Sequence, residues 1–357
     1  MKLFHCSRCA QRLYFENTRC TRCQAELGFC PDRMALLALE REPAQVGQGG
    51  TVWQDLRSGD RFRRCDNGVR HDACNWLVPA TAPDALCAAC RLNRTIPDLS
   101  QPGHRDRWNR LETAKRRLLY SLLRLNLPCN AANGVDGLTF DFLADQPASF
   151  SERGRVLTGH AGGRITINVA EADPVERERL RDQMDEPYRT VLGHFRHESG
   201  HYYWDRLIPN GPWLDDIRWR FGDDRQDYAS ALDRYYRNGP PPDWPQAFVS
   251  AYAASHPWED WAETWAHYLH MVDTLETAWQ FGLTIDVRDE AGPSPSESFD
   301  PYTAMPFDAL IARWLPLTQA LNSLNRSMGH DDAYPFVLAG PAIDKLHLVH
   351  DLIHQSG

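Results

Sequence analysis

Two histidines and a glutamate near the middle of the chain have the spacing that binds a metal ion on a helix. The segment His197-Glu198-Ser-Gly-His201 lies within a run whose apolar residues recur at helical spacing. Residues four positions apart share a helix face, so His197 and His201 can direct their imidazole nitrogens at one ion. Glu198 is placed to polarise a metal-bound water rather than to bind the metal. The segment therefore predicts metal-dependent hydrolysis.

The third ligand must come from elsewhere, because Trp204 and Leu207 stand where a longer motif would need Gly and His. Glu259 and Glu263 would lie one turn apart on one face of a second helix. One carboxylate would complete a His, His, Glu zinc site and leave the fourth position to water. The other would accept the free N–H of a ligand histidine. Rival third ligands, in less clear helical patterns, are Asp205, Asp215 and Asp216.

Together these segments resemble the gluzincin group of metallopeptidases. The spacing Tyr252-x6-Glu259-x3-Glu263 is similar in particular to that of anthrax lethal factor. The resemblance implies that Glu259 is the ligand, that Glu263 supports the site from outside the coordination sphere, and that Tyr252 stabilises the oxyanion. One departure is the stretch of 57 residues between His201 and Glu259, which could reshape or cover the site.

Eight of the ten cysteines form two more sets of candidate ligands. Cys6-x2-Cys9 and Cys20-x2-Cys23 are two thiolate pairs at the spacing of a zinc ribbon, and they can close a tetrahedral site. The second set is looser, because only its last pair is a Cys-x2-Cys turn, and His71 is an alternative ligand there. Cys30 is left over and is most simply buried. The second set is Cys65, Cys74, Cys87 and Cys90.

Nearly the whole chain, cysteines included, resembles a bacterial family of zinc-binding metallopeptidases with an N-terminal zinc ribbon. The resemblance implies an α+β fold in which a zincin-like domain, a small sheet plus active-site helices, follows a zinc-ribbon module. We expect the ribbon module at residues 1–100 and the peptidase domain at 101–357, with an insertion at 205–245 and C-terminal helices at 306–355. The expected cofactors are one catalytic zinc ion and one or two structural zinc ions.

The hydrophobic pattern predicts the elements that position these residues. Strands are expected at 138–142, 155–158 and 164–169, with 159–163 as a hairpin connection. By resemblance to zincin folds, the edge strand would pair with an extended substrate, and we assign that edge to 164–169. Residues 40–50 look like a linker. Helices are predicted at 105–127, 174–184, 188–207, 306–328 and 342–355.

Two clusters of polar residues on predicted helices are interpreted as solvated surface. Lys115-Arg116-Arg117 could contact an anion or a nucleic acid, but three basic residues on a helix usually form a solvated face. The last helix carries His347, His350 and His354, which could bind metal but are more simply explained as surface residues.

Composition narrows the possible partners and location. A chain of 357 residues with 42% hydrophobic content can form two or three domains. Residues 1–100 are slightly basic while the net charge is −9, so the main body is acidic and no nucleic-acid partner is expected. The N-terminus has no apolar signal region and no run of 18 apolar residues exists, which predicts a cytoplasmic protein without a membrane segment. Because the cytoplasm keeps thiols reduced, cysteines in such a protein are better explained as metal ligands than as disulfides.

We therefore expect a zinc-dependent hydrolase of peptide bonds in which Glu198 is the general base. The substrate would be a protein or peptide, and the ribbons could recruit a protein partner. One alternative is hydrolysis of an isopeptide or another amide bond, because the chemistry at zinc is the same. A second is a non-catalytic interaction protein, although a scaffold would not need both a general base and an electrophile.

Overall fold

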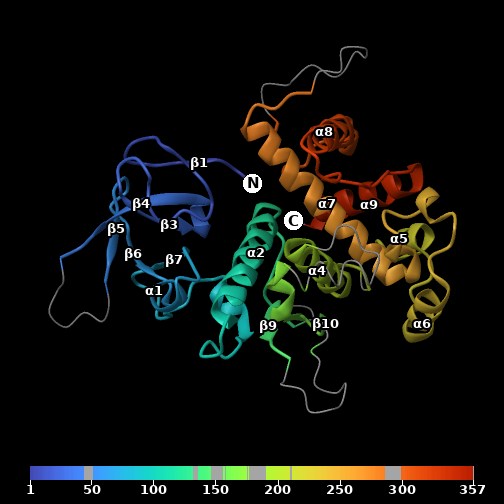
Figure 1. Cartoon of the computed structure of the whole chain (residues 1–357), viewed down its shortest axis with the longest axis horizontal. Helices are drawn as coiled ribbons and strands as arrows, with labels where there is room; N and C mark the ends of the chain where they lie inside the picture. Colours follow the sequence, from blue (N-terminus) through green and yellow to red (C-terminus); the bar gives the residue numbers. More distant parts are fainter. Residues whose placement is uncertain are drawn as a thin grey trace. The chain divides into compact units, whose positions relative to one another are not determined.

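The computed structural model describes residues 1–43, 51–131, 136–145, 156, 158–174, 176, 190–209, 211–285 and 299–356, and Figure 1 shows the chain. The fold is α+β, as the sequence predicted. The chain groups into two compact units. The first contains residues 1–123, 139–158 and 166–174, and the second contains 124–138, 159–165 and 175–357.

Two antiparallel sheets lie within the first hundred residues. A two-stranded ribbon is followed by a five-stranded meander in the order β3-β4-β5-β6-β7, around a core that includes Leu37, Phe62 and Leu77. Strand β4 continues to Arg41, which pairs with Trp53 of β5. The segment predicted as a linker therefore joins two strands of one sheet, although 44–50 lie outside the described residues. The strands are β1 (Phe4–His5), β2 (Arg12–Leu13), β3 (Glu26–Cys30), β4 (Ala35–Arg41), β5 (Trp53–Asp55), β6 (Arg61–Arg64) and β7 (Leu77–Pro79).

Helix α2 (His104–Arg124) carries the basic cluster that was predicted to face solvent, and that prediction was wrong for Lys115 and Arg116, whereas the side chain of Arg117 is 42% exposed. Lys115 is fully buried, and its ammonium lies 2.9 Å from Oε1 of Glu112. Arg116 is also buried, and it donates a hydrogen bond to the carbonyl of Ala73. Both cations are buried because they have acceptors there, as buried charges require. The short elements before α2 are η1 (Pro31–Arg33), α1 (Asp66–His71), η2 (Cys90–Leu92) and β8 (Asn93–Thr95).

A third sheet has the strand order β10-β11-β9-β8. The strand predicted at 138–142 is present, but the predicted hairpin connection is itself strand β10, and only Gly162 and Gly163 form the turn. Both have positive φ, 54° and 77°, which favours glycine in a tight hairpin. The edge assigned to 164–169 was also wrong, because β11 lies between β10 and β9. The elements are β9 (Thr139–Leu143), β10 (Gly159–Ala161), β11 (Arg164–Asn168) and η4 (Val169–Ala172).

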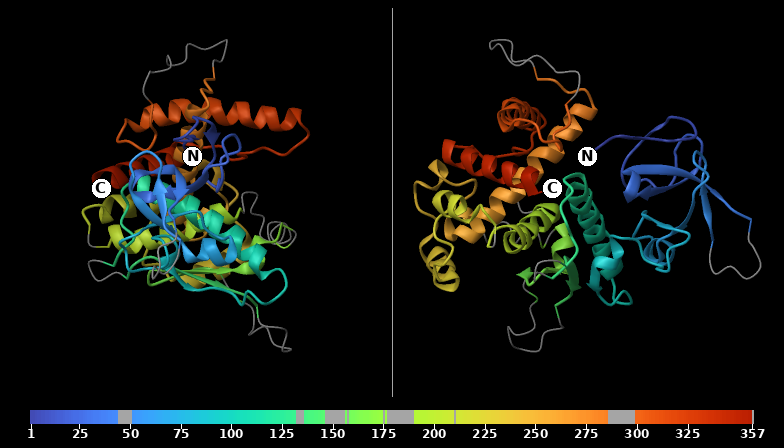
Figure 2. Two further views of the ribbon diagram at one scale, coloured as in Figure 1. Left: turned by 90° about the vertical axis from the view of Figure 1, so that its left-hand side faces the viewer. Right: turned by 180° about the vertical axis from the view of Figure 1, so that it is seen from behind.

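Helices dominate the second unit. The predicted helix at 174–184 lies almost entirely outside the described residues, but the other predicted helices are present. The long helix α7 packs against α4, α8 and α9, and Figures 1 and 2 show the four together. No helix among the described residues is long and apolar enough to cross a membrane. The elements are α4 (Val191–Leu207), α5 (Leu214–Phe221), α6 (Tyr228–Asn238), η5 (Trp244–Gln246), η6 (Tyr252–Ser255), α7 (Pro257–Gln280), α8 (Phe307–Ser327) and α9 (Gly340–Ser356).

Helices α4 and α7 approach closely at a glycine inside the metal-binding motif. A Cβ atom on Gly200 would lie 2.8 Å from Cα of Ala262, so the contact requires a residue without a side chain. Two indoles of α7 reach back to α4: the Nε1–H of Trp261 donates to the carbonyl of Gly200 at 2.8 Å, and that of Trp265 donates to Oγ of Ser199 at 3.1 Å. These contacts fix the face of α7 that meets the motif.

The histidines of the last helix are not simply surface residues. His350 is buried, with Nδ1 2.9 Å from the hydroxyl of Tyr268 and Nε2 2.8 Å from the carbonyl of Met305. His354 lies 3.3 Å from the same hydroxyl, whereas His347 is about half exposed. The interpretation as solvated surface therefore fails for His350, which joins α9 to α7.

Candidate metal centre

The two motif histidines and one carboxylate of α7 form a cluster in the second unit. The ligand atoms of His197, His201 and Glu259 all lie within 4.8 Å of one another. Oε2 of Glu259 is 3.0 Å from Nε2 of His197 and 3.5 Å from Nε2 of His201. A tetrahedral zinc ion with bonds of roughly 2.1 Å would separate its ligands by about 3.4 Å, so the three atoms fit such an ion.

Hydrogen bonding and burial support the same fit. Apart from the two motif histidines, no described residue offers a hydrogen bond to Oε2 of Glu259, the buried carboxylate atom that faces them. The side chain is 1% exposed. A buried carboxylate oxygen without a donor is costly unless a cation meets it. Neutral imidazole and carboxylate are ligands that zinc accepts, so the residues present suit a zinc ion.

The second carboxylate of α7 orients one of the histidines. Nδ1 of His197 lies 2.7 Å from Oε1 of Glu263, and Oε2 of Glu263 accepts a hydrogen bond of 2.6 Å from Ser250. Burial by itself lowers the pKa of His197, but Glu259 and Glu263 outweigh it and raise that pKa well above its usual value. An N–H on Nδ1 leaves Nε2 to face the cluster, which is the orientation that a metal ligand needs.

Glu198 lies beside the cluster with one oxygen uncommitted. Its Oε1 is 3.5 Å from Nε2 of His194, while Oε2 is buried without a hydrogen-bond partner in the described part of the chain. Burial acts to raise the pKa of Glu198, but His194 and the two motif histidines overcome this and lower it. The side chain is therefore ionised near neutral pH and can accept a proton.

Tyr252 is close to the cluster but lies outside the long helix. It begins the 3-10 turn η6, and its ring centroid is 6.0 Å from that of His197. On the other side, the ring of Tyr235 from α6 lies 5.8 Å away. The ring of Tyr252 is therefore near the three candidate ligands.

Four neighbours of the cluster could not be found by sequence reasoning. The ring centroid of Trp258 lies 4.0 Å from that of His201. The ring centroid of His160, in β10, lies 6.3 Å from that of His201, and the two imidazole rings are nearly parallel. Burial and the nearby His201 lower the pKa of His160 to about 4. Ser250 and Tyr228 hydrogen-bond the two carboxylates of α7. No motif marks any of them: His160 and Tyr228 come from segments distant from α7 in sequence, whereas Trp258 directly precedes Glu259.

The first cysteine set converges on one point. The four sulfurs of Cys6, Cys9, Cys20 and Cys23 lie within 4.8 Å of one another. Both Cys-x2-Cys turns have the same backbone form, because Ala10 and Gln24, which follow them, have a φ of 58°. Each of these residues donates a backbone hydrogen bond to the first cysteine of its pair, at 2.9 and 3.0 Å. The two turns can offer four thiolates to one zinc ion.

The four sulfurs of the second cysteine set also lie close together, and the alternative ligand His71 is not part of that cluster. The sulfurs lie within 4.8 Å of one another, and all four side chains are buried. His71 packs its ring edge-on against Trp108 at 5.8 Å and does not join the cluster. Arg116 lies near the sulfurs: burial lowers its pKa, but the charges of Cys74 and Glu112 outweigh burial and raise it. The set comprises Cys65, Cys74, Cys87 and Cys90.

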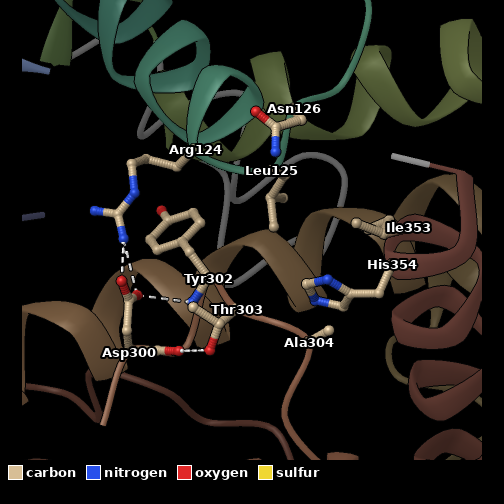
Figure 3. Close-up of a pocket in the computed structure, with 9 residues that line it drawn as sticks. All are labelled: Arg124, Leu125, Asn126, Asp300, Tyr302, Thr303, Ala304, Ile353 and His354. Atoms are coloured by element: carbon tan, nitrogen blue, oxygen red, sulfur yellow. Dashed lines mark hydrogen bonds and ion pairs between the residues drawn. The ribbon is translucent and has the colours of Figure 1, made fainter. Parts of the chain in front are cut away.

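Other candidates do not join a cluster or form a ligand site. Among the described residues, no metal cluster includes Asp205, Asp215 or Asp216. A pocket of about 430 Å³ is lined in part by Arg124, Tyr302 and Thr303, each of which bonds to Asp300, as Figure 3 shows. There Arg124 lies 2.6 and 2.8 Å from the oxygens of Asp300 and 4.7 Å from the ring centre of Tyr302.

Comparison with known proteins assigns the class. Residues 104–352 match a family described as "Putative zinc-binding metallo-peptidase", and residues 3–101 match a zinc-ribbon domain. The chain therefore belongs to this family of zinc-binding metallopeptidases and carries an N-terminal zinc-ribbon domain. The class implies a peptide or protein substrate.

Relatives over the full length come from mycobacteria. An uncharacterized protein of Mycobacterium bovis is 43% identical over 363 residues, which cover 99% of this chain and 96% of the relative. An uncharacterized protein of Mycobacterium tuberculosis strain H37Rv matches with the same identity and coverage. No solved structure matches the chain.

Proposed function

We propose that this protein is a gluzincin-like zinc peptidase that uses His197, His201 and Glu259 to hold the metal. The observation that carries the proposal is the convergence of the two imidazole nitrogens on one otherwise unpartnered carboxylate oxygen. Family membership supports the metal and the class of reaction. The two cysteine sets would each hold a structural zinc ion, which gives three ions per chain.

A zinc ion held by His197, His201 and Glu259 would supply Lewis-acid chemistry toward a water molecule and the carbonyl of the scissile bond. Glu198 accepts the proton of the attacking water at its free oxygen and passes it to the leaving amine. The phenol of Tyr252 donates a hydrogen bond to the oxyanion, a contact worth about 3 kcal/mol in comparable sites. Glu263 keeps His197 in the required tautomer throughout.

Replacement of Glu198 tests the proposed general base. Glu198→Gln keeps the shape of the side chain but cannot accept a proton, so we expect turnover to fall by about 10²-fold to 10⁴-fold. Zinc content should not change, because Glu198 is not a ligand. The measurement is hydrolysis of a peptide library followed by mass spectrometry, with zinc quantified on the same samples. Near-wild-type hydrolysis by this variant would remove Glu198 from the mechanism.

The same experiment can separate substrate classes. Lysine-linked conjugates presented beside linear peptides distinguish an isopeptidase from a peptidase, since the chemistry at the metal would be alike. Cleavage of linear peptides that disappears in the Glu198→Gln variant supports the proposal as stated. If only the conjugates were cleaved, the proposed substrate would be an isopeptide bond and not a peptide bond.

A further inference from the structure

A tyrosine from the inserted segment contacts the carboxylate that completes the proposed zinc site. Tyr228 is the first residue of α6, and its phenol donates a hydrogen bond to Oε1 of Glu259. The other oxygen of this carboxylate, Oε2, faces Nε2 of His197 at 3.0 Å and Nε2 of His201 at 3.5 Å. The two oxygens of Glu259 therefore have different partners.

We propose that Tyr228 is a positioning residue that makes Glu259 a one-oxygen ligand to zinc. The inference rests on the proposed function, because it takes the metal site as given. A carboxylate can bind a metal through one oxygen or both, and a hydrogen bond to one oxygen leaves the other to the ion. Tyr228 also limits rotation of the Glu259 side chain before the metal binds, so less conformational entropy is lost on binding.

The tyrosine ring is itself held by the first turn of α7. It lies edge-on to the rings of Trp258 at 5.5 Å and His256 at 5.2 Å. His256 caps α7: its Nδ1 accepts a hydrogen bond from the amide of Trp258 at 3.0 Å, and its Nε2 lies 3.1 Å from the carbonyl of Gln226. The segment before α6 is thus fastened to the same turn that carries Glu259.

This arrangement gives the insertion a defined contribution to the site. Asp227 caps α6 by accepting a hydrogen bond of 2.8 Å from the amide of Ser230, which fixes where the helix begins and hence where Tyr228 points. An insertion that only covered the site would not need a hydroxyl directed at a ligand. We therefore assign Tyr228 to the support of the metal and not to contact with the substrate.

The test is zinc affinity of the full-length protein with Tyr228→Phe, which removes the hydroxyl and keeps the ring. Zinc itself is the probe, titrated in competition with a chromophoric chelator, and the His197→Ala/His201→Ala variant defines the signal of this site. Loss of a group that supports a metal ligand typically costs about 10-fold to 100-fold in affinity, and we expect that loss here. Turnover at saturating zinc is measured beside affinity, so that weaker metal binding is separated from a loss in the chemical step.

Two further variants make the result specific. Tyr236→Phe removes a phenol from the same helix at a side chain that is 60% exposed, and it should leave zinc affinity unchanged. In a Glu259→Gln background, Tyr228→Phe should add little further loss, because the two residues act through one contact.

The possible results separate the inference from the function on which it rests. Unchanged zinc affinity in a folded Tyr228→Phe protein would overturn the inference and leave the proposed peptidase intact. If Tyr228→Phe lost turnover at saturating zinc but kept its zinc affinity, the inference would also be overturned. The hydroxyl of Tyr228 would then be assigned to contact with the substrate. If the wild type binds no more zinc than the His197→Ala/His201→Ala variant, the proposed function fails, and the inference fails with it.

Discussion

At the scale of single residues, the site is organised by which atom of each side chain is occupied. Glu263 uses both oxygens, one for Nδ1 of His197 and one for Ser250. Glu259 uses one oxygen for Tyr228 and directs the other at the two motif histidines. Two glutamates one turn apart on the same helix therefore have different environments, which is the physical basis for assigning them different roles.

Replacement of Glu263 tests this difference. Glu263→Gln removes the charge that holds His197 in its tautomer, so we expect zinc affinity at this site to fall by about 10-fold to 100-fold. Ser250→Ala should cost less, because the contact between Glu263 and His197 remains. Zinc titration of the full chain measures both. Equal affinity of the Glu263→Gln variant and the wild type would show that the carboxylate does not support the metal.

At the scale of elements, the site depends on how closely α4 and α7 pack. The ligands come from both helices, and Gly200 and Ala262 allow their backbones to approach. Trp261 and Trp265 then fix the rotation of α7 through their indole N–H groups. A small change in helix separation would move Glu259 away from both histidines, so the glycine within the motif has a packing role besides any chemistry.

Gly200→Ala should therefore destabilise the protein even though alanine favours helices. The new methyl group would overlap Ala262, and overpacking costs about 1–3 kcal/mol, whereas the gain in helix propensity is about 1 kcal/mol. We expect a lower unfolding midpoint and weaker zinc binding. Gly340→Ala is the matched control, because the space around that position is open. Stabilisation by Gly200→Ala would mean that the helices can separate without cost.

At the scale of the whole molecule, the described residues contain three clusters of candidate ligands. The two cysteine clusters are in the first compact unit and the His, His, Glu cluster is in the second. Closed sites of four thiolates are typical of structural zinc, whereas three protein ligands leave a position for catalysis. The domain boundary near residue 100, the cytoplasmic location and a partner for the ribbons stay predictions.

Metal content per chain tests this division. Plasma mass spectrometry should find three zinc ions in the wild type and two in the His197→Ala/His201→Ala variant, because the cysteine sites are independent of the motif. A mild chelator should remove the ion of the second unit first, since that site has only three protein ligands. A count that is the same in both proteins would mean that the motif holds no metal as purified.

Local sequence patterns were sufficient to predict those parts of the candidate site that lie on a single helix or turn. The spacing of His197 and His201 requires a shared helix face, the pair Glu259 and Glu263 does the same, and Cys-x2-Cys turns bring sulfurs together whatever surrounds them. Whereas the α+β class was implied by the resemblance to a known family, most helices followed from periodicity for the same reason. In each case the information is contained in a few neighbouring residues.

Contacts between distant segments were visible only in the folded chain. They bring Tyr228 and His160 to the site, bury Lys115 and Arg116, and make β10 rather than β11 an edge of the described sheet. A basic residue on a helix looks solvated until its acceptor is known, and strand order is not contained in the pattern of any one strand. Such features depend on which surfaces pack together in the fold, and the periodicity of a single segment does not specify those contacts.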